Sequence, residues 1–261
     1  SELAGRLENA GKGADVIEVR LDCLNISEFD PSDRETNEAF LDELARLNGR
    51  GRKPVLLTLR PEEEGGCRQL SRTERESFWN SGRLFGWADL EEDLAMLPIK
   101  AEVRIRSHHD FSGVPADLAD IYSRLAVADV CKLALMTGQA SDAIPLWKLL
   151  VEAASAGKAF IPIGMGEAGK WTRILSLAHG AFMTYASIDD ASEAAPGQIS
   201  ARDLAGVFRV KELDRATEVF GIVAGDSSYS ASPWMHNAAF RAAKMNRVFV
   251  PLQVKELGVF I

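Results

Sequence analysis

The stretch DVCKLALMTGQASDAIPLWKLLVEAASAGKAFIPIG (residues 129–164) joins two short apolar runs through a longer amphipathic segment. The runs Asp129–Leu135 and Phe160–Gly164 predict strands, because they are short, apolar and bounded by turn residues. The segment from about Asp142 to Ala156 predicts a helix, with Ser141 placed to cap its start. A strand, a helix and a second strand in this order are typical of a parallel sheet covered by helices.

The same alternation continues on both sides of this stretch. One predicted helix runs from about Asp33 to Leu47 and stops at Asn48-Gly49, a common C-terminal signal. Seven strands are one fewer than a closed (β/α)8 barrel needs. Because the chain starts inside a predicted helix, Glu2 to Ala10, we expect the missing first strand to precede residue 1. The five further predicted strands are Asp15–Leu21, Val55–Arg60, Ala88–Glu91, Val103–His109 and Ala181–Ala186.

A polar stretch, Lys211–Thr217, follows the last predicted helix of the barrel, which runs from about Ala201 to Val210. After it the sequence predicts a strand over Val219–Ala224, a serine-rich loop, a helix and another strand. We therefore expect one domain over residues 1–212 and the beginning of a second over residues 217–261.

The composition argues against several classes of partner and cofactor. A net charge of −8 disfavours nucleic acid, because phosphate binding needs a basic surface. The sequence has no apolar run of about 18 residues that would span a membrane. It also has no signal peptide at its start, so a cytoplasmic location is expected. The three cysteines form no CxxC pair and are predicted to be reduced thiols. The four histidines show no metal-ligand spacing, so neither a metal nor another cofactor is expected.

Glu18 and Arg20 share one face of the strand Asp15–Leu21, because side chains alternate along a strand. In a barrel that face points inward, and active sites of barrels lie at the C-terminal ends of the strands. The two residues are therefore candidates for substrate binding as an ion pair. A buried ion pair with a purely structural role is the alternative.

Lys132 interrupts the apolar strand Asp129–Leu135 and shares a face with Val130 and Ala134. Lysine is rarely buried, because removing its ammonium group from water is costly. Burial lowers the pKa of a lysine, and the neutral amine is the nucleophile that forms a Schiff base with a ketone. A lysine on an exposed face, or one whose ammonium group reaches solvent, is the alternative.

Other polar residues follow the remaining strands. His109 ends the strand Val103–His109, where a group that titrates near neutral pH suits a general base. A hydrogen bond within the next loop is the alternative for it. Glu64 lies in an acidic run that also fits a solvated loop. Arg173 could bind a carboxylate or cap a loop, and Pro196-Gly197-Gln198 is a common turn sequence.

Taken in order, these residues resemble the type I 3-dehydroquinate dehydratases, lysine Schiff-base enzymes with a (β/α)8 TIM barrel. The resemblance covers about residues 2–210. It implies a lyase of the shikimate pathway of aromatic amino acid biosynthesis that converts 3-dehydroquinate to 3-dehydroshikimate without a cofactor. The segments that carry it are Glu18-Val19-Arg20-Leu21-Asp22, Arg60, Glu64-Gly65-Gly66, Ser107-His108-His109-Asp110-Phe111, Lys132, Gly164-Met165-Gly166, Arg173 and Ala195-Pro196-Gly197-Gln198.

The resemblance also implies a role for each residue. Lys132 would form the Schiff base with the C3 ketone, and His109 would take a C2 proton and later assist the loss of water and the hydrolysis of the imine. Glu64 would orient and tune His109, and Arg173 would bind the substrate carboxylate. The full set of implied substrate contacts is Glu18, Arg20, Arg60, Arg173, Gln198, Met165 and Tyr185.

From about residue 219 the chain resembles the start of a shikimate dehydrogenase. In Tyr229-Ser230-Ala231-Ser232-Pro233, Ser230 and Ser232 would bind the shikimate carboxylate. The chain ends before the catalytic lysine and the NADP-binding domain of that family, so dehydrogenase activity is not expected. The order of the two parts resembles bifunctional enzymes, and a C-terminal dehydrogenase domain is the expected partner in the full-length protein.

Two alternatives stay open at this point. Another Schiff-base barrel enzyme, such as a class I aldolase, would also place a lysine on a strand, although it leaves the His-Asp-Phe and Pro-Gly-Gln segments unexplained. A ligand-binding fragment without turnover would have the same sequence, and an assay is needed to separate it from a working enzyme.

Overall fold

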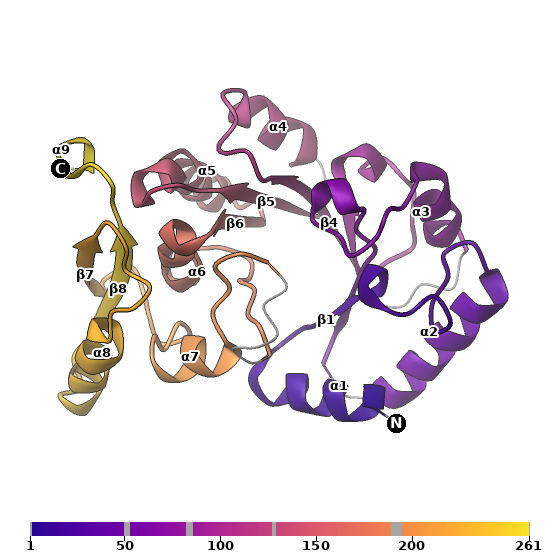
Figure 1. The fold of residues 1–261 in the computed structure, drawn as a ribbon, viewed down its shortest axis with the longest axis horizontal. Coiled ribbons are helices and arrows are strands. Elements are labelled where there is room, and N and C mark those ends of the chain that lie inside the picture. Colours follow the sequence, from indigo (N-terminus) through magenta and orange to yellow (C-terminus); the bar gives the residue numbers. More distant parts are fainter. Residues whose placement is uncertain (1, 50–52, 82–85, 127–128, 189–194, 261) are drawn as a thin grey trace. The chain divides into compact units, whose positions relative to one another are not determined.

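The structure is a computed structural model that describes residues 2–49, 53–81, 86–126, 129–188 and 195–260. Figure 1 shows the elements in chain order. The strands are β1 Ile17–Arg20, β2 Val55–Thr58, β3 Trp87–Glu91, β4 Val103–Asp110, β5 Val130–Met136, β6 Phe160–Met165, β7 Glu218–Ala224 and β8 Arg247–Gln253. The α-helices are α1 Glu2–Gly13, α2 Arg34–Asn48, α3 Arg72–Trp79, α4 Leu118–Leu125, α5 Ile144–Ser155, α6 Lys170–Leu175, α7 Ala201–Gly206, α8 Ser232–Ala242 and α9 Leu257–Phe260. Short 3-10 turns are η1 Leu21–Cys23, η2 Glu62–Glu64, η3 Glu92–Leu94, η4 Ala140–Ala143, η5 Glu167–Gly169 and η6 Leu177–His179.

The first six strands form one sheet, and their order in the sheet follows the sequence from β1 to β6. Strands β1 to β4 pair in parallel, with Arg20 beside Thr58 and Glu91 beside Ser107. Because parallel neighbours end at the same edge of a sheet, residues that follow them are candidates for a shared site. All six of these strands were predicted, and each boundary is confirmed to within two residues.

The seventh predicted strand, Ala181–Ala186, is wrong. The Ala181 amide donates to the carbonyl of Ser176, the residue before η6, at 3.0 Å, so it is not available for pairing with a strand. The Phe182 amide then donates to the Phe160 carbonyl at 2.9 Å, at the start of β6. The end of the segment forms an isolated parallel bridge, Ser187 to Ser200. An apolar run therefore became an extended loop.

Helix α2 begins and ends as its sequence predicts. The Asp33 side chain accepts hydrogen bonds from the Glu35 and Thr36 amides, and Gly49 follows the last turn. Helix α5 begins differently from the prediction, because the turn η4 precedes it and Ser141 does not cap it. Asp142 instead accepts from the Gly138 and Gln139 amides at 2.8 and 3.0 Å, which caps the start of the turn η4.

The chain divides into two compact units. The first unit contains the chain up to His108 and the start of β5. Its core joins the apolar faces of β1 to β3 with those of α1 to α3. Leu44, Leu57 and Phe78 are almost fully buried there, and the rings of Phe29 and Phe78 meet edge to face at 5.1 Å.

The second unit contains the rest of the chain. Helices α5 and α6 pack against β6, and α8 packs against the parallel pair β7 and β8 (Figure 1). The Asn237 side chain fixes α8 to β8 by two hydrogen bonds with the Phe249 backbone, at 2.9 and 2.8 Å. Val248 and Val250 of β8 share a core with Ile174 and Phe208. The predicted strand, loop, helix and strand after residue 217 are confirmed.

Within the described residues, no helix combines the length and the apolar character that crossing a bilayer requires.

Candidate active site

The predicted ion pair between Glu18 and Arg20 is not formed. The Arg20 guanidinium instead binds Asp22 with two hydrogen bonds of 2.9 and 2.6 Å, and Glu18 accepts a hydrogen bond from Thr58 at 2.8 Å. Asp22 is closer to the turn that ends β1, so it offers Arg20 a bidentate geometry that a neighbour on the flat strand cannot. Glu18 and Arg20 are both half-buried in the first unit.

A buried network of charges surrounds Arg60, which follows β2. Its Nη2 lies 2.8 Å from Asp89 Oδ2 and its Nε lies 3.5 Å from Glu91 Oε1, both on β3. Arg75 of α3 lies 3.4 Å from Glu91 and binds Asp93 at 2.6 and 2.9 Å. Burial raises the pKa of Glu91 to about 7, with Arg60 opposing the shift and Asp89 adding to it. The network holds the Arg60 guanidinium in one place.

Glu64 is the last residue of η2, two residues before Gly66. Burial raises the pKa of Glu64 to about 8; the charge of Glu91 adds to the shift and that of Arg60 opposes it. A carboxyl group that is neutral near pH 7 can donate a hydrogen bond as well as accept one. The turn after it is tight, because a Cβ on Gly66 would lie 2.0 Å from the Arg60 carbonyl oxygen. Glycine is therefore required there.

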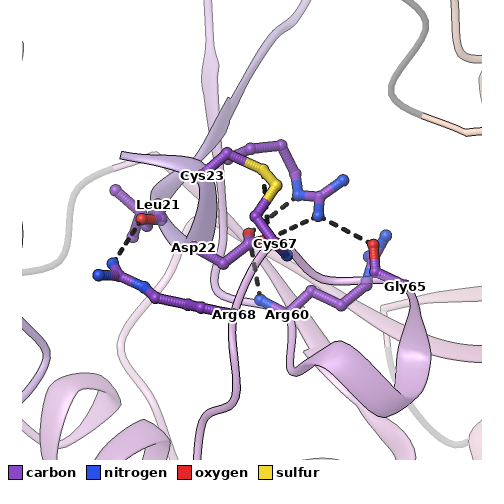
Figure 2. The surroundings of a disulfide bond; sticks show 8 residues. Leu21, Asp22, Cys23, Arg60, Gly65, Cys67 and Arg68 are labelled. Atoms are coloured by element: carbon purple, nitrogen blue, oxygen red, sulfur yellow. Dashed lines mark hydrogen bonds and ion pairs between the residues drawn. A yellow bond between two sulfur atoms is a disulfide. The ribbon is translucent and has the colours of Figure 1, made fainter. Parts of the chain in front are cut away.

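The prediction of three reduced cysteines is wrong for two of them. Cys23, at the end of η1, forms a disulfide with Cys67, which follows the Glu64 turn (Figure 2). The two are 44 residues apart, but the parallel pairing of β1 and β2 brings their Cα atoms to 5.0 Å. Asp22 and the two sulfur atoms also form a compact group of possible metal ligands. Sulfur atoms joined in a disulfide are not the thiolates that bind a metal, so this group does not fit one.

The two neighbouring histidines of β4 have different surroundings. His109 is buried, and its position at the end of the strand is as predicted. His108 lies on the other face with its Nδ1 2.8 Å from Glu92 Oε2. Arg104, on that same face, binds Asp129 at 2.9 Å. Two of the polar residues that alternate along β4, Arg104 and His108, therefore find acidic partners outside the strand.

Lys132 is buried at the middle of β5, with 2% of its surface exposed. This rules out the alternative of a lysine on an exposed strand face. Its Nζ lies 4.3 Å from the centroid of the Tyr185 ring, an arrangement in which the ring face attracts an ammonium group. Tyr185 is itself buried, in the segment between η6 and α7.

The turn that carries Gln198 packs closely on the end of β6. Gly197 has a positive φ of 74°, and a Cβ on it would lie 2.2 Å from the Gly166 carbonyl oxygen. The Gly166 amide donates to the Pro196 carbonyl at 3.0 Å. Because Gly166 directly follows the buried Met165, the predicted binding residues Met165 and Gln198 lie in neighbouring segments.

Arg173 is almost fully buried in α6, and three contacts place this helix. The Gly164 amide donates to Thr172 Oγ1 at 3.0 Å, and this hydroxyl donates to the Gly169 carbonyl at 2.8 Å. A Cβ on Gly164 would lie 2.8 Å from the Gly169 Cα, so the helix start and β6 approach with no room for a side chain. Gly164, Gly166 and Gly169 also have the GxGxxG spacing of dinucleotide-binding loops. Here the three glycines are used for packing.

Ser230 and Ser232 lie at the start of α8 in the part of the second unit that contains β7 and β8. The Ser232 amide donates to the Ser230 hydroxyl at 3.2 Å, and both residues are half-buried. They are thus adjacent, as their spacing predicts.

Three acids and a second arginine were not predicted from the sequence. Asp22, Asp89 and Glu91 are buried carboxylates that hold predicted binding residues, and Arg75 holds Glu91. Asp89 and Glu91 had a visible signal, because acids two residues apart in a short buried strand share one face. Arg75 had no such signal in the sequence, because its position beside Glu91 depends on how α3 packs against the sheet.

Comparisons with known proteins show which family and which solved structures this chain is similar to. The family model described as type I 3-dehydroquinase matches residues 1–215. A protein of Methanosarcina acetivorans named 3-dehydroquinate dehydratase is 36% identical over 209 residues, covering 73% of this chain and 82% of the relative. The crystal structure of 3-dehydroquinate dehydratase from Geobacillus kaustophilus superposes with a TM-score of 0.64 at 26% identity, covering 80% of this chain and 84% of the other.

A longer relative aligns with almost the whole chain. The chloroplastic bifunctional 3-dehydroquinate dehydratase/shikimate dehydrogenase of Arabidopsis thaliana is 30% identical over 267 residues, which cover 95% of this chain. The chain spans 41% of the length of that relative.

Proposed function

The chain belongs to the type I 3-dehydroquinase family, and from this membership we propose that it converts 3-dehydroquinate to 3-dehydroshikimate in the shikimate pathway, through a Schiff base on Lys132. The observation that carries the proposal is the burial of Lys132 against the Tyr185 ring. A buried amine in a chain of this family has the chemistry of a nucleophile toward a ketone.

The proposed reaction begins when the Lys132 amine attacks the C3 ketone and water leaves, giving a protonated imine. The imine withdraws electrons from C2, so His109 can take the C2 proton and leave a stabilised carbanion-like intermediate. The C1 hydroxyl then departs as water with a proton from His109, and hydrolysis of the imine releases the product. Glu64 orients and tunes His109, and its raised pKa supports this role because it can then exchange a proton near neutral pH.

The proposed binding residues supply charge and hydrogen bonds to the substrate. Arg173 binds the carboxylate, as a forked guanidinium does well. Glu18, Arg20, Arg60 and Gln198 bind the ring hydroxyls. The anchoring of Arg20 by Asp22 and of Arg60 by Asp89 supports this assignment, because a fixed donor orients a substrate better than a mobile one. Met165 and Tyr185 line the apolar side of the pocket. No metal or other cofactor takes part.

We also propose the domain organisation. Residues 1–212 form the dehydratase, and the six parallel strands that the structure describes there belong to the TIM-barrel fold of the family. Residues 217–261 begin a shikimate dehydrogenase substrate-binding domain, in which Ser230 and Ser232 bind the shikimate carboxylate. The alignment of nearly the whole chain with the bifunctional Arabidopsis protein supports this division. A dehydrogenase domain is then the expected partner in the complete protein.

The cytoplasmic location stays a prediction. The Cys23–Cys67 disulfide argues against this prediction, because structural disulfides rarely persist in a reducing cytosol.

A turnover assay tests the proposed function. The purified chain is mixed with 3-dehydroquinate in buffer with a metal chelator, and the conjugated double bond of the product is followed by ultraviolet absorbance. Wild-type protein is expected to turn over, and Lys132→Met, which keeps the length of the side chain without the amine, is expected to be inactive. A class I aldolase would instead cleave a carbon–carbon bond. A folded wild-type chain that gives no product would contradict the proposal.

A further inference from the structure

The disulfide joins the two segments that carry Arg20 and Glu64. Cys23 comes three residues after Arg20 at the end of β1, and Cys67 comes three residues after Glu64 in the turn that follows β2. Figure 2 shows the sulfur bridge beside the hydrogen bonds of Asp22. The bridge therefore links two neighbouring parts of the proposed active site through a covalent bond.

Asp22 binds polar groups from both of these segments. Its side chain is fully buried, and it accepts hydrogen bonds from the Cys67 amide at 2.9 Å and the Arg60 amide at 3.3 Å. Burial alone would raise the pKa of Asp22, but the Arg20 guanidinium and these amides hold the pKa below its ordinary value. Asp22 thus stays ionised and fixes Arg20 through hydrogen bonds in which the sulfur atoms take no part.

The Glu64 turn has weaker anchors of its own. The Arg20 Nη2 donates to the Gly65 carbonyl at 3.2 Å, in contact with solvent. The Cys67 amide on Asp22, and Arg68 Nη2 donating to the Leu21 carbonyl at 3.0 Å, also tie this segment to the end of β1, and the disulfide adds a covalent bond to these contacts. Hydrogen bonds near solvent contribute little stability individually, so the covalent bond limits how far the turn can move.

Both cysteines are exposed, whereas Cys131 is buried. Exposed disulfides are the ones that soluble dithiols reach and reduce, while buried ones resist. One dithiol delivers two electrons to the bridge; the Sγ–Sγ bond breaks, each sulfur takes a proton, and the reductant closes into its own disulfide. Reoxidation reverses the exchange.

We propose that Cys23 and Cys67 are positioning residues that form a reversible redox site, and that their disulfide holds the Glu64 turn in its active position. This inference rests on the proposed function. Reduction leaves Arg20 and Arg60 on their carboxylates but frees the turn. It therefore lowers kcat, which depends on Glu64, more than it raises KM, which depends on the arginines.

The test compares oxidised and reduced forms of the full chain. Thiol titration of denatured samples counts the sulfhydryl groups: three cysteines less the joined pair leave one in the oxidised form, and reduction restores three. Reduction is expected to lower kcat on the order of tenfold, as small displacements of catalytic groups do, and reoxidation to restore it. KM should stay within about twofold and the borohydride-trapped adduct on Lys132 should persist. The double variant Cys23→Ser/Cys67→Ser should have the low kcat and not respond to dithiol.

The outcomes separate this inference from the proposed function. Equal kcat in folded oxidised and reduced protein overturns the redox proposal alone, as does a wild-type chain that has three thiols after mild oxidation. Loss of the far-ultraviolet circular dichroism signal on reduction also overturns it, because the bridge would then support the fold instead of the turn. Absence of both turnover and the Lys132 adduct in the oxidised form contradicts the proposed function itself.

Discussion

The Nζ of Lys132 lies 4.3 Å from the centre of the Tyr185 ring, and both side chains are buried. Lys132 belongs to β5, while Tyr185 belongs to a loop more than 50 residues later, so the contact depends on the fold and not on local sequence. A ring face beside an ammonium group attracts it and excludes water from one side of the amine. The ring is therefore part of the environment in which the lysine reacts.

Replacing Tyr185 by leucine should lower kcat/KM about tenfold, because a desolvated contact between the ring and the protonated imine formed at this nitrogen is worth on the order of 1–2 kcal/mol. Tyr185→Phe keeps the ring and should retain most of the activity. Steady-state kinetics of the two variants measure the difference. If the leucine variant matches the wild type, the ring has no role in the reaction.

The adjacent histidines of β4 provide a matched pair. His109→Ala should lower kcat about 100- to 10,000-fold, the usual effect of removing a general acid–base group. His108→Ala removes the contact of its Nδ1 with Glu92 on the other face and should cost at most about 1 kcal/mol of unfolding free energy with kcat unchanged. Steady-state kinetics measure kcat of both variants, and denaturant titration measures their unfolding free energies. Similar losses of kcat in both would show that strand damage, and not lost chemistry, explains the effect.

Gly197→Ala should displace the turn that carries Gln198. The added Cβ would meet the Gly166 carbonyl oxygen at 2.2 Å, and the positive φ disfavours alanine as well. We expect KM to rise about tenfold, as the loss of one good hydrogen bond to the substrate does, with a destabilisation on the order of 1–3 kcal/mol. Gly206→Ala is the control, because nothing lies within 4 Å of its Cβ position. Unchanged KM in Gly197→Ala would argue against a role of the turn in binding.

Glu91 should make stability fall as pH rises. Its pKa is about 7 in the folded chain, against about 4.5 for an ordinary glutamate, so the folded state binds the proton more tightly. The stabilisation is complete below about pH 4.5 and is lost as pH rises to 7, a change on the order of 2–3 kcal/mol.

Denaturant titrations between pH 5 and pH 8 measure this decline, and Glu91→Gln is the comparison. Glutamine has no proton to release, so the variant should lose less unfolding free energy over the same interval. Glu64, with its pKa raised to about 8, adds a decline of the same sign that remains in the variant. Parallel pH dependence in both proteins would contradict the assignment to Glu91.

The sequence was sufficient for the elements that depend on local pattern. Six strands of the first sheet and helix α2 follow from alternation, apolar spacing and caps, and the buried position of Lys132 follows from an apolar run that it interrupts. The run Ala181–Ala186 had a similar composition but forms a loop, because its first amide already donates to the Ser176 carbonyl. Composition alone does not report which backbone groups are already bonded.

Contacts between distant segments could not be predicted in the same way. Asp22 competes with Glu18 for Arg20 because the chain turns after β1, and no pattern in the strand indicates that turn. Cys23 and Cys67 pair because β1 and β2 are neighbours, although 44 residues separate them. Counting cysteines excluded a CxxC motif but gave no information on this proximity.

The central claim is a Schiff base on Lys132, and trapping it is the most direct measurement. The oxidised full chain is incubated with 3-dehydroquinate, reduced with borohydride, digested and analysed by peptide mass spectrometry. We expect a reduced adduct on the peptide that contains Lys132, and none in Lys132→Met. A folded chain that turns over the substrate without this adduct, or that carries it on another lysine, would contradict the account.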